Sequence, residues 1–391
     1  MLGGDADGNL GDRAILQATC RQIQELAPEA AVAVVSGDGA RASRDYGARA
    51  IAPGPRGFLS LCAAAARSDL VLIGGGGLFQ DDDSLVKMPY WALRVALMRL
   101  FCRRVVGYAL GVGPLRAGIS RLAARLAFAC MEQVTVRDPE ALEVAQPLTG
   151  KRVGLVPDPA LLLPPADPEA ARDLLRRHGV PLDGRPLVGV ALRRWFPAKP
   201  RIVPNKIAHR LPWRRERPPE PEAEALTAGL ARALDALVRE HGAFVLFLPT
   251  YTYAHEGDDR VCEAVAARMT APAGARAMLR LDDAALYKAV AGELAVLLGG
   301  RMHPTILAAA MGTPVVGLAY NPKFMGFFEL LGAADRVLDV GRFVREDRAE
   351  ELSALLDGAL RERSGPPRER IETLTAPIRS LNRALFGELA R

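Results

Sequence analysis

Short apolar runs alternate with amphipathic stretches along most of the chain, and this alternation predicts an α/β fold. Residues 70–73 and 105–110 are continuous apolar runs of strand length, whereas residues 90–103 repeat apolar side chains every three or four positions, as a helix does. Strands that are apolar throughout are typical of parallel sheets buried on both faces. The pattern therefore predicts parallel sheets that are covered by helices on both sides.

A proline-rich stretch divides this alternation into two halves. Residues 161–167 read LLLPPAD, which is typical of a linker, and a second series of strands and helices follows it. A chain of 391 residues is long enough for two domains. We predict an N-terminal domain over 1–163, a C-terminal domain over 164–367 and a last helix over 368–391 that can cross back to the first domain.

Composition excludes several classes of protein. The net charge of +6 is mild and the basic residues are spread out, so the chain lacks the footprint of a nucleic-acid binder. Its five cysteines are widely separated and form no CxxC pair, which favours buried free thiols over disulfides or a zinc site. Without a signal segment or a long uncharged apolar run, we expect a cytoplasmic protein, with transient contact with an anionic membrane surface compatible with its charge.

The N-terminus carries a glycine-rich loop with polar side chains. Residues 3–13 read GGDADGNLGDR, and we expect a helix over 14–26 whose start points at Asn9 and Asp12. Such loops normally follow a strand, which Met1 and Leu2 alone cannot supply. Either this strand is unusually short, or the sequence begins inside a longer natural strand, and we expect the latter.

Four consecutive glycines follow the strand predicted over 70–73. Gly75 and Gly76 lie within this run and would let the backbone approach a ligand closely, although a tight strand-to-helix turn explains the pattern equally well. Asp81 opens a run of three aspartates just beyond it. Such a run is usually a solvated helix start, but beside a glycine pocket one carboxylate could serve as a base.

The stretch 299–323, GGRMHPTILAAAMGTPVVGLAYNPK, holds the strongest candidates for anion binding. Arg301 and His303 stand where a strand gives way to a helix, beside backbone N–H groups that suit a phosphate or carboxylate, and Lys323 ends the stretch. The alternative is a buried arginine and a hydrogen-bonded histidine at the seam between two domains. Arg193 ends the strand predicted over 187–192, and the basic segment 196–221 that follows could be a flap over the site or a solvated loop.

Three motifs together resemble the polysaccharide pyruvyl transferase family, and in particular its cell-wall-polymer branch, which is associated with S-layer anchoring. They lie across almost the whole chain: Gly8-Asn9-Leu10-Gly11-Asp12 with Ala14-Ile15, the stretch 74–81, and Arg301-Met302-His303 with Pro314 and Lys323. The resemblance implies two Rossmann-like domains that face each other across a cleft, as in GT-B glycosyltransferases, with the acceptor in the first domain and the donor in the second.

The resemblance also implies phosphoenolpyruvate as the donor and a glycan or its lipid-linked precursor as the acceptor, met at the inner face of the membrane. Arg301, His303, Arg193 and Lys323 would hold the donor, and Asn9, Gly75 and Gly76 would contribute to substrate binding. His303 is the candidate acid, and Asp12 or Asp81 the candidate base. Ketal formation involves no redox step, so we expect no cofactor, and no metal ligands are predicted.

Two other functions remain open at this point. A nucleotide-sugar glycosyltransferase of the same fold would need an acidic residue that grips the donor ribose, for which the sequence offers only Glu329. A non-catalytic sugar-binding protein would keep the fold without the chemistry. A nicotinamide dehydrogenase is less well supported, because it depends on the glycines alone.

Overall fold

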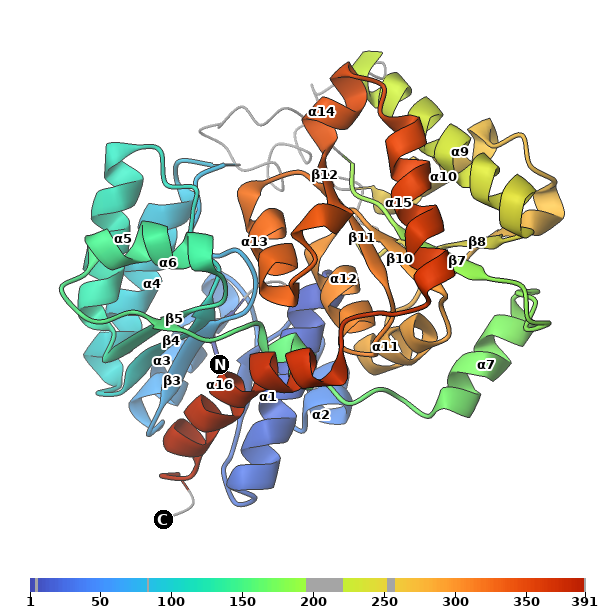
Figure 1. Ribbon diagram of the computed structural model, residues 1–391. Helices are drawn as coiled ribbons and strands as arrows, with labels where there is room; N and C mark the ends of the chain where they lie inside the picture. The colour runs from blue at the N-terminus through green and yellow to red at the C-terminus, as the bar shows by residue number, and fades with distance from the viewer. Residues whose placement is uncertain (4–5, 83, 195–220, 252–256, 390–391) are drawn as a thin grey trace. The chain divides into compact units, whose positions relative to one another are not determined.

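The structure is a computed structural model, and it describes residues 1–3, 6–82, 84–194, 221–251 and 257–389 (Figure 1). The described chain forms two compact units. Unit 1 contains residues 1–163 and 373–389, and unit 2 contains residues 164–194 and 221–372. The chain therefore returns to the first unit after completing the second.

Unit 1 is built on a four-stranded parallel sheet of order β3-β4-β5-β6 and a separate parallel pair, β1-β2. The strands are β1 (Ala33–Val35), β2 (Arg49–Ile51), β3 (Val71–Gly74), β4 (Val105–Leu110), β5 (Gln133–Val136) and β6 (Gly154–Leu155). Leu2 forms a parallel bridge with Ile73, and the amine of Met1 donates a hydrogen bond to the carbonyl of Ala33 at 2.5 Å. These first two residues thus occupy the strand position between β1 and β3.

Helices cover this sheet on both sides (Figure 1). They are α1 (Leu10–Leu26), α2 (Gly39–Tyr46), α3 (Phe58–Ala66), α4 (Lys87–Phe101), α5 (Gly118–Cys130), α6 (Pro139–Ala145) and the last helix, α16 (Arg368–Phe386), with short 3-10 helices at Pro55–Gly57, Gln146–Leu148 and Pro159–Leu162. The buried Tyr108 of β4 donates a hydrogen bond to Asn382 of α16 at 2.6 Å, and its ring packs against Phe386. The end of α16 is therefore part of the core of unit 1.

Unit 2 is built on a six-stranded parallel sheet of order β12-β11-β10-β7-β8-β9. The strands are β7 (Leu187–Ala191), β8 (Phe244–Phe247), β9 (Arg276–Met278), β10 (Val296–Gly299), β11 (Val315–Ala319) and β12 (Val337–Asp339). Every residue of the four central strands is buried. Burial on both faces explains why these strands are continuous apolar runs.

The helices of unit 2 lie on both sides of its sheet (Figure 1). They are α7 (Pro168–Arg177), α9 (Pro221–His241), α10 (Asp258–Arg268), α11 (Ala284–Gly292), α12 (Met302–Ala309), α13 (Pro322–Leu331), α14 (Val340–Arg345) and α15 (Ala349–Glu362), with 3-10 helices at Ala273–Ala275 and Ala334–Arg336. Helices α9, α10 and α15 pack together, and α7, α11 and α12 form a second group. No helix among the described residues is both long and apolar enough to cross a bilayer.

The predicted α/β class with two Rossmann-like domains is confirmed, and several boundaries differ from those predicted. Helix α1 begins at Leu10 rather than at residue 14, because the side chain of Asn9 caps it. The run 293–298, ELAVLL, predicts a strand from residue 293, whereas β10 begins at Val296, because Glu293 still closes helix α11. The cleft between the domains stays a prediction, and the basic segment lies outside the described residues up to Pro221, where α9 begins.

Candidate active site

The carboxyl ends of neighbouring strands in unit 2 bring four sequence-predicted residues to one edge of the sheet. Arg193 follows β7, Arg301 and His303 follow β10, and Lys323 follows β11. Because β7, β10 and β11 are adjacent and parallel, these residues share the edge at which α/β folds bind ligands. The structure therefore assembles three cationic side chains and a histidine from segments 130 residues apart.

Arg301 is held in place by a buried carboxylate. Its Nε donates to Asp258 Oδ2 at 2.9 Å and its Nη2 to Asp258 Oδ1 at 2.5 Å. Asp258 is fully buried, and it also accepts a hydrogen bond from the backbone N–H of Tyr251 at 3.0 Å. The guanidinium lies 5.5 Å from the ring centroid of Tyr251. These two hydrogen bonds fix the plane of the guanidinium. An arginine held in this way can bind an anion in a defined orientation.

Arg193 is oriented by an aromatic ring. Its guanidinium carbon lies 4.3 Å from the ring centroid of Tyr320, which follows β11. The N–H of Gly300 donates to the carbonyl of Ala191 at 2.8 Å, so the backbone after β10 lies directly against the end of β7. Stacking leaves the donor groups of a guanidinium at its rim, where they can meet a carboxylate or phosphate.

His303 lies at the strand-to-helix junction predicted from the sequence, and α12 already includes it in its first turn, because the helix begins at Met302. Arg301 is the N-cap residue of this helix, and within the described residues no side chain caps it by a hydrogen bond. The first N–H groups of a helix have no partner inside the helix and carry its positive dipole end. Lys323 holds the corresponding place in α13, where Asn321 is the cap, and its side chain is buried. Two helix starts thus meet the same sheet edge.

Unit 1 places the other predicted residues around its glycine loop. The side chain of Asn9 accepts a hydrogen bond from Gly11 N–H at 2.9 Å, so Asn9 is a helix cap. Asp12 lies one residue further into α1 and is almost buried. It faces Gly76, where a β-carbon would stand 2.3 Å from Asp12 Oδ1. A cavity of about 20 Å³ adjoins Asp12 and Gly75, which is room for roughly one water molecule.

Replacing Gly76 by alanine should therefore disturb this loop. Gly76 has φ +69°, which costs a side-chain-bearing residue about 1–2 kcal/mol, and the new methyl group would push the Asp12 carboxylate away. We expect Gly76→Ala to lower the free energy of unfolding by about 1–2 kcal/mol, which denaturant titration measures. Gly118→Ala in the same unit is the matched control, because its β-carbon would meet nothing within 4 Å. Equal effects of the two substitutions would contradict the prediction.

Asp81 has a structural contact that the sequence did not indicate. Its carboxylate is buried and accepts hydrogen bonds from the backbone N–H groups of Arg116 and Ala117, at 2.9 Å each for the shorter contacts. It thereby anchors the segment that leads into α5. Its role as a base stays a prediction, beside the same role for Asp12.

Sequence reasoning missed the partners that orient the arginines. Asp258 is separated from Arg301 by 43 positions, and Tyr320 is far in sequence from Arg193. It also missed the buried pair of Arg137 and Asp158 in unit 1, joined at 2.9 Å. The sequence does carry one feature that all of these residues share. Each is a polar or aromatic residue that lies just beyond a parallel strand, or at the start of the helix that follows such a strand.

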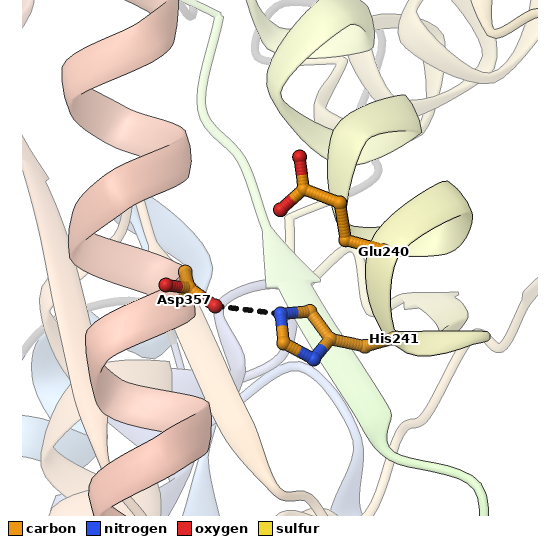
Figure 2. Close-up of side chains that lie close together, drawn as sticks. All are labelled: Glu240, His241 and Asp357. Carbon is orange, nitrogen blue, oxygen red and sulfur yellow. Dashed lines mark hydrogen bonds and ion pairs between the residues drawn. The ribbon is translucent and has the colours of Figure 1, made fainter.

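A group of possible metal ligands lies elsewhere in unit 2. Glu240 and His241 end α9, and Asp357 lies on α15, where its Oδ1 is 2.6 Å from His241 Nε2 (Figure 2). The same oxygen accepts a hydrogen bond from Arg361 Nε at 2.8 Å. The Arg361 guanidinium, with His241 as a lesser contributor, holds the pKa of the Asp357 carboxyl below its ordinary value. A cation already occupies this carboxylate, so the group is best described as an ion-pair network that joins α9 to α15.

The sequence profile named Polysaccharide pyruvyl transferase matches residues 9–322. This range covers the first glycine-rich motif from Asn9 onward, the second one over 74–81, and Arg301 and His303 of unit 2, and it ends one residue before Lys323. The chain belongs to the polysaccharide pyruvyl transferase family. No curated protein sequence is significantly similar to it.

Solved structures with the same fold confirm the GT-B-like class of this pyruvyl transferase family member. A UDP-GlcNAc 2-epimerase from Methanocaldococcus jannaschii has TM-score 0.58 at 9% identity, covering 92% of this chain and 91% of its own. The UDP-GlcNAc 2-epimerase from Neisseria meningitidis bound to UDP-GlcNAc has TM-score 0.57 at 9% identity, covering 98% of each chain. A glycosyltransferase from Rickettsia africae has TM-score 0.55 at 10% identity, covering 100% and 97%. At such identities the likeness concerns the fold alone.

Proposed function

We propose that this protein transfers the pyruvyl group of phosphoenolpyruvate to two hydroxyls of a sugar, forming a ketal on a cell-surface glycan or its lipid-linked precursor. The family match over residues 9–322 is the observation that carries the proposal. The chemistry of the unit 2 edge supports it, because a donor with a carboxylate and a phosphate needs several oriented cations.

The donor would bind to unit 2. Tyr320 stacks on the guanidinium of Arg193, and Asp258 forms hydrogen bonds with that of Arg301. Because these contacts already orient both side chains, little side-chain entropy is lost when an anion binds. The start of α12 adds backbone N–H groups that suit a phosphate. Lys323 would add positive charge from α13.

The reaction balances without an oxidant or a reductant. One sugar hydroxyl bonds to the central carbon of phosphoenolpyruvate and gives up its proton to a base, while the methylene carbon of phosphoenolpyruvate gains a proton and becomes a methyl group. Phosphate then leaves with its electron pair, and the second hydroxyl bonds to the same carbon and loses its proton. His303 is the proposed donor of the proton to the methylene carbon, a step for which positioned acids contribute roughly 10²- to 10⁴-fold.

The acceptor would bind to unit 1, where Asp12 or Asp81 would take the hydroxyl proton and the backbone at Gly75 and Gly76 would allow close approach of the sugar. Resemblance to the cell-wall-polymer branch favours a lipid-linked aminosugar such as N-acetylmannosamine. An acceptor of that kind would bring the protein to the inner face of the membrane.

The direct test is phosphate release from phosphoenolpyruvate in the presence of acceptor sugars. We expect release only with a suitable β-linked hexosamine or galactose, together with an acceptor product whose mass has gained one pyruvyl ketal. A parallel assay offers UDP- and GDP-sugars with the same acceptors. Sugar transfer from a nucleotide donor without phosphate release from phosphoenolpyruvate would overturn the proposal in favour of a glycosyltransferase.

A further inference from the structure

Helices α4 and α5 of unit 1 expose an unusual number of large apolar side chains. The two helices pack against each other (Figure 1). The most exposed members are 56% to 74% accessible: Leu93, Leu100, Ile119, Leu122 and Leu126. Single exposed apolar residues are normal, but a contiguous group of them marks an interaction site.

The spacing of these residues shows that each helix has a second apolar stripe. On α4, Trp91, Val95 and Met98 are buried against the sheet, while Leu93 and Leu100 point away from it. On α5, the outward residues follow one another at intervals of three and four, as a single helix face requires. A helix with apolar residues on opposite faces needs something to cover the outer face.

The charge of this region is of one sign only. From residue 84 to residue 131 the sequence contains eight lysines and arginines and no aspartate or glutamate. Exposed arginines accompany the apolar stripes: Arg99 in the last turn of α4, Arg103 two residues beyond that helix, and Arg121 and Arg125 on α5. We name the exposed apolar and arginine side chains of α4 and α5 the α4–α5 face.

We propose that the α4–α5 face docks onto the surface of an anionic lipid bilayer. Interfacial helices combine leucine and isoleucine on one face with lysine and arginine at its borders, so that the apolar groups enter the acyl boundary while the cations meet headgroup phosphates. A face for a protein partner would carry both signs of charge, whereas the segment 84–131 that forms this face contributes only positive charge to it. The complementary surface therefore has negative charge at its outside and an apolar layer below that charge. An anionic lipid bilayer has both.

This docking would serve the proposed function, because a lipid-linked acceptor would be presented to the unit that carries the α4–α5 face. The inference does not depend on the reaction, since lipid binding is measured without donor or acceptor. Absence of pyruvyl transfer and absence of vesicle binding are thus separate results.

The test is co-sedimentation of the full-length protein with vesicles of phosphatidylcholine alone and with vesicles that also contain phosphatidylglycerol. We expect binding to the anionic vesicles that weakens as salt is added. A variant in which four leucines are replaced by glutamine, at positions 93, 100, 122 and 126, should bind the vesicles at least about 100-fold more weakly, because the apolar contact is lost. Arg99, Arg103 and Arg125→Glu should also weaken it by at least about 100-fold, since each arginine near such a surface contributes roughly fivefold.

Matched controls lie on the exposed surface of unit 2. Arg177, Arg239 and Arg268→Glu change the net charge by the same amount, and Leu182→Gln removes an exposed leucine there. Both control variants should bind anionic vesicles as the parent protein does. The melting temperature of every variant should equal that of the parent protein, which shows that the variants fold. Failure of the parent protein to bind anionic vesicles, or equal loss in the controls, would overturn the proposal. So would a dimer in analytical ultracentrifugation that the leucine variant dissociates, without any vesicle binding.

Discussion

Replacing Arg301 by methionine should lower the unfolding free energy of this pyruvyl transferase family member by about 3–5 kcal/mol. The reason is Asp258, which is fully buried and would lose the guanidinium that pairs with both of its oxygens. A buried carboxylate without its partner costs several kcal/mol, far more than the methionine gains by packing. Urea denaturation followed by circular dichroism measures the change.

A double variant separates this structural effect from a role in donor binding. In Arg301→Met with Asp258→Asn, the buried charge is gone on both sides, and the asparagine oxygen can still accept from Tyr251 N–H. We expect the double variant to recover more than half of the lost stability. Pyruvyl transfer should stay at least about 100-fold below that of the parent protein, because the oriented charged donor is still missing.

The control is the same substitution at an exposed ion pair nearby. Arg280 contacts Asp259 and Glu263 on the surface, and Arg280→Met should change stability by less than about 1 kcal/mol. If the double variant were no more stable than Arg301→Met alone, the ion pair would not be the source of the loss. If it regained full activity, Arg301 would have no part in binding the donor.

The sequence was informative wherever a single segment determines its own structure. The apolar run of β11 indicates a strand within a few residues, because burial on both faces requires apolar side chains at every position. The proline at the start of α6 indicates a helix start, because its fixed φ suits the first helical turn. The start of α1 was misjudged for a local reason as well. Asn9 lies in a glycine-rich loop, where its side chain could satisfy a turn or a helix cap equally well.

The orientation of the candidate site could not be predicted, because it depends on contacts between distant segments. Nothing around Arg301 in the sequence indicates that its guanidinium turns toward Asp258, since the two meet only when β8 and β10 take places on either side of β7. The stacking of Arg193 on Tyr320 likewise requires β7 and β11 to flank β10. Strand order is a property of the whole sheet, whereas the residue types at each strand end are visible in the sequence.

His303→Gln should lower pyruvyl transfer by about 10²- to 10⁴-fold while leaving stability almost unchanged. The side chain is half-buried in the first turn of α12, and glutamine can still donate a hydrogen bond but cannot deliver a proton. Steady-state rates of phosphate release measure the loss. The exposed His178 provides the matched control, and His178→Gln should leave the rate as it is.

The pH profile distinguishes a proton donor from a hydrogen-bond donor at this position. A group that donates a proton in the reaction must carry that proton in the substrate complex, so the rate falls once the group is deprotonated. If His303 supplies the proton, the parent rate should fall on the alkaline side, and His303→Gln should lack that limb as well as most of the rate. If His303 only donates a hydrogen bond to the phosphate, glutamine should retain most of the rate with an unchanged profile. That result would assign the acid to another group at the edge of the unit 2 sheet. Lys323 would be the next residue to replace, since among the described residues of that edge it is the remaining cation that could give up a proton.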